Sequence, residues 1–317
     1  MNRRRKLLSF ILIAMFFTAL PGQATEAPLR VGTLAGVSGL AMVKMMAEPD
    51  AASRYRFNVY KSPELLTAHV IAGEVDLAAL PVNSAALLYN KEVPIHLTSV
   101  IGWGVMYLVS GDRSLGSWPA LKGKEIHIAG KGAVSDLIFR YLALKNGLED
   151  GRDYRIQYLA PAELAQFAAA GRAPYAVLPE PWVTEALQRN PRLKVALDLQ
   201  EEWKRIEEGR FTYPQTVLIA RQSLLRSDSS RVAAFEKELD AGIRWLNLNP
   251  KQGGVLAEKS IQVSAVAVRE GIKRCNLSYL KAAEARSQIM TFLERLGTMA
   301  PEAIGGKLPD AGFIYQP

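Results

Sequence analysis

The sequence predicts an α/β protein of two similar lobes, because two motifs occur once in each half of the chain. The first motif spans residues 72–81 (AGEVDLAALP) and returns at residues 170–179 (AGRAPYAVLP). Each copy has a glycine turn, a short apolar run and a Leu-Pro pair. Short apolar runs between turn signals favour strands buried on both faces of a parallel sheet. Proline has no backbone N–H, but the N–H at the first position of a helix would have no partner within the helix. Proline is therefore well suited to a helix start, and we expect a helix at each Leu-Pro pair.

A glycine-rich turn precedes the Leu-Pro motif at a similar distance in each half. Residues 30–39 (RVGTLAGVSG) lead into a helical pattern at 40–46, and residues 125–133 (EIHIAGKGA) lead into one at 134–145. In open α/β sheets, ligands bind where helices begin at the carboxyl ends of strands. The four repeated turns therefore predict four helix N-termini facing one cleft between the lobes.

The remaining elements follow from alternation, apolar runs and helix-start signals. Residues 55–60 alternate apolar and polar side chains like a strand, and Ser62 followed by Pro63 is typical of a helix start. In the first half we expect further strands at 29–34, 95–101 and 105–110, and helices at 64–72 and up to residue 90. In the second half we expect a strand at 154–159, a helix at 162–170, a returning strand at 216–220, and helices at 232–246, 250–260 and 280–296.

Two crossings, near Ser110 and near Tyr213, should join the lobes. The expected divisions are a leader (1–24), the first part of lobe 1 (28–109), lobe 2 (110–213) and a return segment with C-terminal helices in lobe 1 (214–317). Residues 115–123 are expected to form a surface linker into the second lobe. A chain of 317 residues with 49% hydrophobic content is long enough to bury two such cores.

Residues 1–24 have the pattern of a secretory signal peptide. Four basic residues precede an apolar stretch at 7–20, and Gly22-Gln23-Ala24 fits a small-residue cleavage site. A stretch of 14 apolar residues is short for a bilayer span, which leaves a retained anchor as the alternative. The basic residues also fit a twin-arginine signal, so the export route stays open. Because no cysteine directly follows the apolar stretch, we expect a periplasmic protein without a lipid anchor.

The charge balance gives no reason to expect nucleic acid as a partner, and the single cysteine excludes an intrachain disulfide. Without the leader's four basic residues, 35 Lys and Arg face 31 Asp and Glu, a net charge of +4 that gives no reason to expect nucleic acid as a partner. Cys275 is the sole cysteine, so the chain has no intrachain disulfide, and we expect its thiol to be packed rather than reactive.

The glycine turns supply the first candidate ligand-binding residues. Glycines let the backbone approach a ligand, and helix N-termini favour anions such as carboxylate, sulfonate or phosphate. The alternative is that these are the ordinary turns that every such sheet requires. The candidates from the two turns are Gly36, Val37, Ser38, Lys131, Gly132, Ala133 and Ser135.

Further candidates lie next to the Leu-Pro pairs and at the crossings. Asn83 and Ser84 can cap a helix or bind a ligand. Trp103, between two glycines, is expected to form an aromatic wall of the cleft, with core packing as the alternative. Glu180 beside Trp182 could hold a ligand amine or ring nitrogen, or Glu180 could interact with its own helix N-terminus. Tyr213, beside the second crossing, is a weaker candidate.

The usual catalytic constellations are missing from the sequence. The three histidines, His69, His96 and His127, are scattered, and Cys275 has no nearby histidine. No Gly-x-Ser-x-Gly pattern occurs, and the Gly130 turn lacks the third glycine of a dinucleotide fingerprint. The acids at 201–202 and 207–208 are typical of a solvated helix face. We therefore expect no enzyme, no metal and no cofactor.

Several segments resemble one family of transport proteins. They are the Gly-Glu-Val-Asp-Leu-Ala run with its Leu-Pro pair and Asn83, the approach Leu121-Lys122-Gly123-Lys124, Pro179-Glu180-Pro181-Trp182, and Gly305-Gly306-Lys307-Leu308-Pro309. Together they resemble the periplasmic substrate-binding proteins of the nitrate, sulfonate, taurine and thiamine-precursor ABC importers. The resemblance covers nearly all of the chain after the leader. It implies a type II periplasmic-binding fold and delivery of a small molecule to a membrane permease and its ATPase.

The expected function is capture of a small molecule for import, by a protein expected to be a monomer. The helix starts and Lys131 indicate an organic anion such as a sulfonate, whereas Trp103, Trp182 and Glu180 indicate a flat heterocycle such as a pyrimidine or a thiamine precursor. The alternatives are a small-molecule enzyme on the same fold, similar to pyrimidine-precursor synthases or lyases, and a sensor that presents its ligand to a membrane kinase.

Overall fold

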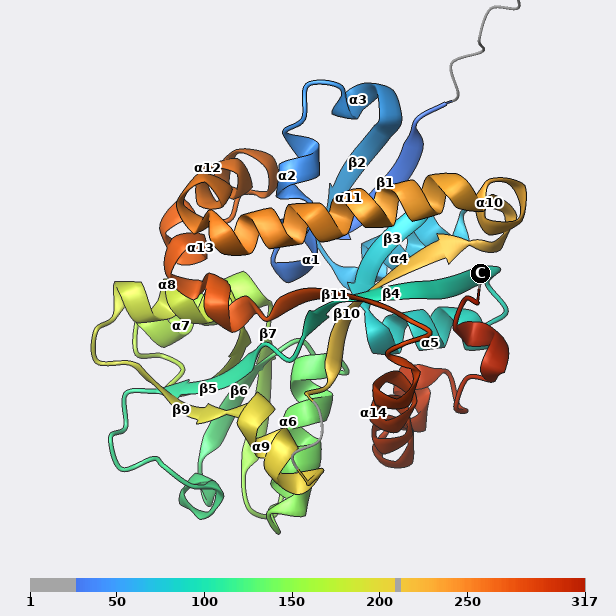
Figure 1. The fold of residues 1–317 in the computed structure, drawn as a ribbon. Helices are drawn as coiled ribbons and strands as arrows, with labels where there is room; N and C mark the ends of the chain where they lie inside the picture. The colour runs from blue at the N-terminus through green and yellow to red at the C-terminus, as the bar shows by residue number, and fades with distance from the viewer. Residues whose placement is uncertain (1–26, 209–211, 317) are drawn as a thin grey trace, which may run out of the picture.

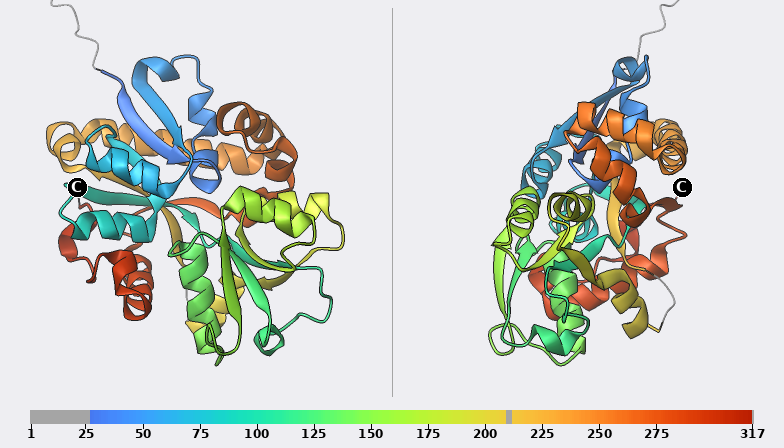
Figure 2. Two further views of the ribbon diagram at one scale, coloured as in Figure 1. Left: turned by 180° about the vertical axis from the view of Figure 1, so that it is seen from behind. Right: turned by 90° about the vertical axis from the view of Figure 1, so that its left-hand side faces the viewer.

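Two separate β-sheets organise the chain into two lobes (Figure 1). The computed structural model describes residues 27–208 and 212–316, and the expected leader at 1–24 lies outside these described residues. One sheet has six strands in the order β11-β4-β10-β3-β1-β2, and the other has five in the order β7-β6-β8-β5-β9. Helices flank both sheets (Figure 2). The expected α/β fold of two lobes is confirmed.

The first sheet contains the first Leu-Pro motif and the returning strand. Its strands are β1 (Leu29–Leu34), β2 (Tyr55–Tyr60), β3 (Leu77–Pro81), β4 (Ile95–Trp103), β10 (Pro214–Arg221) and β11 (Leu277–Lys281). β1 pairs in parallel with β2 and β3, whereas β10 lies antiparallel between β3 and β4. Because β10 runs antiparallel, its start lies beside the carboxyl end of β3.

The second sheet repeats this pattern with the second Leu-Pro motif. Its strands are β5 (Met106–Ser110), β6 (Glu125–Ala129), β7 (Arg155–Leu159), β8 (Tyr175–Pro179) and β9 (Lys194–Asp198). β6 pairs in parallel with β7 and β8, and β5 lies antiparallel to β8 and β9. The two halves thus have the same local arrangement of parallel strands with one antiparallel strand next to the Leu-Pro strand.

Helices begin where the parallel strands end. In lobe 1 they are α1 (Val37–Leu40), α2 (Val43–Met46), α3 (Ala51–Arg54), α4 (Pro63–Ile71), α5 (Val82–Asn90), α10 (Gln222–Ser227), α11 (Ser229–Leu248), α12 (Pro250–Ile261), α13 (Ala265–Gly271) and α14 (Arg286–Met299). In lobe 2 they are α6 (Val134–Lys145), α7 (Pro161–Ala169), α8 (Trp182–Arg189) and α9 (Leu199–Ile206). Short 3₁₀ turns cover Trp118–Leu121, Ile272–Cys275, Pro301–Ile304 and Ala311–Phe313. Among the described residues, no helix is both long enough and apolar enough to span a bilayer.

The first crossing between the lobes lies nearer the N-terminus than the sequence indicates. β4 ends at Trp103 in the first sheet, and β5 already pairs with β8 and β9 of the second, with Tyr107 opposite Leu178. The expectation that lobe 1 continues to residue 109 is therefore wrong, because an apolar strand buried on both faces does not indicate which sheet it joins. The second crossing precedes β10, and a bond from Gly104 N to Tyr213 O, 2.9 Å long, joins the two crossings.

Three local expectations also differ from the structure. The helix expected at 40–46 is two short helices, α1 and α2, with Ala41 and Met42 between them. Residues 115–123 are not a solvated linker, because Leu115, Trp118 and Leu121 are buried. Residues 277–281 form the edge strand β11, so the helix expected from 280 begins only at Arg286.

The C-terminal part of lobe 1 packs against lobe 2 as well as against its own sheet. α13 lies against α8, and α14 lies against α6 (Figure 1). Asn276 Nδ2 donates to Gly104 O at the first crossing, and Tyr107 Oη on β5 donates to Arg274 O at 3.1 Å. The segment from α13 to β11 therefore braces the two lobes at the side where the chain crosses between them.

Candidate ligand-binding cleft

A cavity of about 580 Å³ lies between the lobes and is lined from both. Lobe 1 contributes the ends of β1 and β3 and the start of α4, and lobe 2 contributes the ends of β6, β7 and β8 and the helix starts that follow. The carboxyl ends of parallel strands share one edge of a sheet, so residues distant in sequence meet there. The volume falls in the range of about 300–1,000 Å³ that small-molecule sites occupy.

Both glycine turns line this cavity, and each is closed by a serine in the same way. The Ser38 hydroxyl donates to Leu34 O at 3.3 Å, and the Ser135 hydroxyl donates to Ala129 O, the last carbonyl of its preceding strand. Both serines are buried. Their hydroxyl protons thus stabilise the turns, which supports the ordinary structural role that the sequence left open for them. Gly36, Val37 and Ala133 line the cavity beside them.

The first turn requires a glycine at position 39 for packing rather than for backbone conformation. A Cβ there would lie 2.6 Å from Leu34 O and 3.2 Å from the Ile261 side chain. We expect Gly39→Ala to lower the free energy of unfolding by about 1–3 kcal/mol, because backbone cannot move aside cheaply. Urea denaturation measures the loss. Gly116→Ala, where a Cβ would meet nothing within 4 Å, is the control, and equal losses in both variants would contradict this explanation.

Two lysines and two uncapped helix starts place positive charge and free N–H groups at the cavity. Lys61 and Lys131 line it from opposite lobes, and neither has an ion-pair partner within residues 27–208 and 212–316. α6 and α7 follow Ala133 and Ala160, whose side chains offer no acceptor to the first-turn N–H groups. Free N–H groups at a helix start carry partial positive charge. A carboxylate, sulfonate or phosphate would find donors from both lobes here.

The cavity also has acidic and aromatic walls. Glu64 and Glu163 line it without an ion-pair partner among the described residues. Trp182 is half-buried at the start of α8, and Tyr158 lines the cavity while its hydroxyl donates to Asp136 at 3.0 Å. Much of the remaining wall is apolar. Such walls suit a ligand with a flat or aliphatic body.

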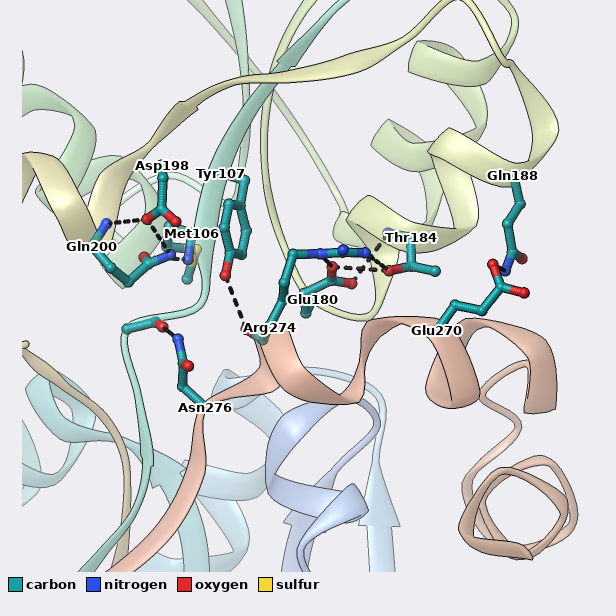
Figure 3. Close-up of polar contacts among 11 residues, drawn as sticks. Met106, Tyr107, Glu180, Thr184, Gln188, Asp198, Gln200, Glu270, Arg274 and Asn276 are labelled. Carbon is teal, nitrogen blue, oxygen red and sulfur yellow. Dashed lines mark hydrogen bonds and ion pairs between the residues drawn. The ribbon is translucent and has the colours of Figure 1, made fainter. Parts of the chain in front are cut away.

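The Glu180 carboxylate, although it lies at the cavity wall, is fully engaged within the protein (Figure 3). It accepts bonds from Thr184 N at 3.1 Å and from the Thr184 hydroxyl at 2.9 Å, and it pairs with Arg274 of lobe 1. Burial raises the pKa of Glu180 above its ordinary value, and the Arg274 charge opposes this rise. The structure therefore favours the second of the two roles expected for Glu180, at its own helix start, over contact with a ligand amine.

Trp103 and Tyr213 lie outside the cleft. The Trp103 indole donates to Ser278 O of β11 at 3.0 Å, and Trp103 lines a separate cavity of about 610 Å³ with Arg274. The expected aromatic wall at Trp103 is thus wrong, because it is Val105 and Met106 that turn toward the cleft after β4. Tyr213 is 1% exposed and donates to Gln200 Oε1 at 2.7 Å, so it belongs to the core beside the second crossing.

Asn83, Ser84 and Gly132 lie at an adjoining cavity of about 420 Å³. This cavity shares Glu64 and Lys131 with the main cleft. Asn83 Nδ2 donates to Gly132 O at 3.4 Å, a contact between lobe 1 and lobe 2. These three residues thus line the adjoining cavity rather than the main cleft.

Sequence reasoning missed several residues that line the cleft. Lys61 directly precedes the Ser62-Pro63 helix start, so the signal that identified the other turns was present there too. Tyr158 ends a strand next to the second glycine turn, which is a weaker signal of the same kind. Gln215 follows the second crossing, and nothing in the local pattern indicates that its side chain faces the cleft.

The histidines and the cysteine are elsewhere. His69 pairs with Glu74, His96 contacts Gly312 O at 2.7 Å, and His127 lies on β6 near Glu125. Cys275 is buried, and burial raises the pKa of its thiol. Within residues 27–208 and 212–316, no three His, Cys, Asp or Glu side chains are grouped as a metal ion would require.

The comparisons with known proteins agree with this geometry. No family model and no curated protein matches the sequence. Among solved structures, an ABC transporter protein from Parabacteroides distasonis is 29% identical with a TM-score of 0.77, and the match covers 92% of this chain and 99% of that one. The periplasmic aliphatic sulphonate binding protein SsuA from Escherichia coli is 15% identical with a TM-score of 0.71, covering 92% and 93% of the two chains.

The periplasmic nitrate-binding protein NrtA from Synechocystis PCC 6803 is 13% identical with a TM-score of 0.65, covering 88% of this chain and 84% of that one. At such identities the likeness to the sulphonate-binding and nitrate-binding proteins concerns the fold and not the ligand. The chain has the periplasmic-binding fold, and its structural neighbours are the substrate-binding proteins of ABC transporters.

Proposed function

We propose that this chain is an extracytoplasmic solute-binding protein that captures a small molecule between its lobes and delivers it to an ABC import permease with its ATPase. One observation carries the proposal: a single cavity is lined by strand ends and helix starts of both lobes. A ligand that touches both lobes binds the closed arrangement more tightly than an open one. This difference in affinity drives closure.

The ligand that the cleft supports best is a small organic anion such as a sulfonate. Lys61 and Lys131 face it from opposite lobes, and the starts of α6 and α7 offer free N–H groups. The apolar part of the wall suits an aliphatic or aromatic body attached to the anionic group. Nitrate, which has no such body, would leave most of a 580 Å³ cavity to water.

A heterocycle such as a pyrimidine or a thiamine precursor is the second candidate. Trp182 and Tyr158 offer aromatic faces, and Glu64 and Glu163 offer carboxylates to a ring nitrogen or an amine. The two candidates differ in which charges of the cleft they use. An anion needs the lysines, and an amino-heterocycle needs the acids.

The cellular setting of the proposal rests on the sequence and on the neighbours. The leader pattern at 1–24 supports export, with the protein free in the periplasm as a monomer. Two structural neighbours are named as periplasmic binding proteins. A small-molecule enzyme and a ligand-presenting sensor are the competing functions. Turnover of the bound molecule would identify the first, and co-purification with a kinase rather than a permease would identify the second.

A thermal-shift screen of the chain without its leader tests the binding function. The panel consists of sulfonates, nitrate, carboxylates and pyrimidines, followed by a broad metabolite library. At a concentration of about 100 Kd, a ligand that binds only the folded state adds about 2.7 kcal/mol, which corresponds to a rise in Tm of about 5 °C or more. If nothing in the library raises Tm, and native mass spectrometry of the isolated protein finds no bound molecule, the proposed function is wrong.

Lys131→Ala separates the two ligand classes. For an anionic ligand we expect a loss in affinity of about tenfold or more, because a hydrogen bond to a charged group contributes about 1.5–3 kcal/mol. For an uncharged heterocycle we expect a change below threefold. Calorimetric titration measures both. Lys122→Ala, an exposed lysine of the same lobe outside the cleft, is the matched control and should leave affinity unchanged.

A further inference from the structure

We propose that Gln215 selects ligands that carry a hydrogen-bond donor and an acceptor on the same carbon atom, as in an amide, a urea or an aminopyrimidine. The inference rests on the proposed function and goes further by assigning the chemical edge that the cleft recognises. It concerns a residue on the returning strand β10, not a residue of the repeated turns.

The sheet topology brings Gln215 to the cleft. β10 runs antiparallel to β3 and β4, so its first residues lie where those strands end. Thr216 is opposite Pro81 of the first Leu-Pro motif, and Pro214 is opposite Trp103. Gln215, between them, lines the same cavity as the helix starts of both lobes.

The pairing of β10 with β4 is irregular at this residue. The register shifts between Pro214 and Thr216 and again between Thr216 and Val217. An extra residue in one strand of an antiparallel pair redirects side chains, and such bulges are frequent beside functional sites. In a regular strand, consecutive side chains point to opposite faces, yet Gln215 and Thr216 both line the cleft.

The Gln215 carboxamide is buried without a protein partner. The residue is 8% exposed, its Oε1 is buried and unbonded, and no hydrogen bond of its Nε2 occurs among the described residues. Buried polar groups in folded proteins are nearly always bonded to protein, water or a ligand. An unbonded amide in the wall of a ligand-sized cavity therefore indicates that a group of the ligand forms hydrogen bonds with it. In the ligand-free protein, water would take that place.

A second buried glutamine nearby shows the structural alternative. Gln200 is 3% exposed, and its Oε1 accepts from Met106 N at 2.8 Å and from Tyr213 Oη at 2.7 Å (Figure 3). Its Nε2 donates to Asp198 at 3.0 Å. The Gln200 amide thus forms its hydrogen bonds within the protein, at the two crossings. The Gln215 amide has no such bonds to the described residues and is free to bond to a ligand in the cleft.

The chemistry of a carboxamide determines the ligand class. It presents one acceptor and two donors in one plane and pairs bidentately with a complementary donor and acceptor. Rotation by 180° about its last side-chain torsion exchanges the oxygen and the nitrogen. The carboxamide can therefore pair with the ligand's donor and acceptor in either arrangement. A sulfonate or nitrate group has only acceptors and would leave Oε1 unpaired, so in an organic anion the edge would belong to the body that carries the anionic group. The Val105, Met106 and Trp182 side chains in the same cavity suit the flat body that such an edge implies.

Calorimetric titration with matched probes tests the inference on the chain without its leader. The probes are 4-aminopyrimidine and cytosine, which carry the edge, pyrimidine, which lacks the amino donor, and methanesulfonate and benzenesulfonate, which carry only acceptors. Gln215→Leu removes the edge at similar volume, and Gln215→Glu replaces its donor by a second acceptor. Gln222→Leu, just beyond the other end of β10, is the matched control. The best stabiliser of the metabolite screen is titrated alongside.

We expect 4-aminopyrimidine or cytosine to bind at least tenfold more tightly than pyrimidine, and Gln215→Leu to abolish that preference. Because the amide has no protein partner, the Tm of ligand-free Gln215→Leu should equal or exceed that of the unmodified protein. A merely structural role would instead lower that Tm. If the best stabiliser lacks the donor–acceptor edge, or if Gln215→Leu binds it unchanged, this inference fails while the proposed function stands. If no molecule binds at all, the proposed function itself fails.

Discussion

Replacing Arg274 with methionine should lower the free energy of unfolding by about 2–4 kcal/mol, one of the two largest effects that we expect from a single change. The Glu180 side chain is 0% exposed, and among the described residues Arg274 is its one cationic partner, joined across the lobes. Removing one member of a buried pair costs about 3–5 kcal/mol because the remaining charge is uncompensated. The expected value is lower here because Arg274 is itself 36% exposed and partly screened by water.

Urea denaturation of three variants separates this charge effect from loss of packing. Arg269→Met removes an exposed arginine of the neighbouring helix α13 and should change stability by less than about 0.5 kcal/mol. The double variant with Arg274→Met and Glu180→Gln should recover part of the loss, because a neutral amide no longer requires a cation. A loss for Arg274→Met no larger than for Arg269→Met would contradict the assigned role of the pair.

The loss in Arg274→Met should also depend on pH. Burial already raises the folded-state pKa of Glu180 above its unfolded value, and removal of the arginine raises it further. A raised folded-state pKa contributes stability that is complete below the unfolded pKa and is lost as pH rises through the folded pKa. The difference between the variant and the unmodified protein should therefore be largest near neutral pH and should shrink as pH falls toward the ordinary range of a glutamate. A difference independent of pH would exclude the charge as its cause.

Gln200→Leu should cause a loss of similar size, about 2–4 kcal/mol, because one amide bonds to both crossings between the lobes. The change leaves Met106 N and the hydroxyl of Tyr213, which is 1% exposed, without their acceptor. Each unsatisfied buried group costs about 1–3 kcal/mol. Trp203, Tyr213 and Phe292 pack around this point, with the Tyr213 and Phe292 rings stacked 5.2 Å apart, so water has little access to the stranded groups.

Tyr213→Phe is the control for Gln200→Leu. It deletes one hydroxyl and leaves Gln200 bonded to Met106 and Asp198, so we expect a loss of about 1 kcal/mol. Urea denaturation ranks the two variants, and hydrogen exchange at the Met106 amide should accelerate only in Gln200→Leu. If Gln200→Leu is no less stable than Tyr213→Phe, the amide does not hold the crossings together.

Local sequence chemistry was enough to predict the repeated turns of the site. The glycine turns and the Leu-Pro pairs have signals within about ten residues, and these turns line one cavity between the lobes. Even there, the detail differs: Pro81 and Pro179 are the last residues of their strands, and α8 begins only at Trp182. Proline favours the boundary between a strand and a helix but does not fix its position to the residue.

Features that depend on long-range pairing could not be predicted. β5 joins the second sheet through partners about 70 and 90 residues away, and its apolar sequence suits either sheet equally. Arg274 pairs with Glu180 across 94 residues, so the sequence suggested a ligand for a carboxylate that the protein itself neutralises. Trp103 was misplaced because glycines on both sides indicate a free backbone but not the direction of the indole. Gln215 has no local signal, since its burial follows from a bulge in a ladder between distant strands.

The central claim is that a small molecule is held between two lobes that close on it, and a distance between the lobes tests it most directly. Ala72 at the end of α4 and Ala170 at the end of α7 are exposed equivalents in the two halves. Cysteines there can be spin-labelled while buried Cys275 stays protected. Pulsed electron paramagnetic resonance should show one shorter, narrower distance distribution when the best stabiliser of the screen is added. An unchanged distribution at saturating ligand would contradict capture by closure of the lobes.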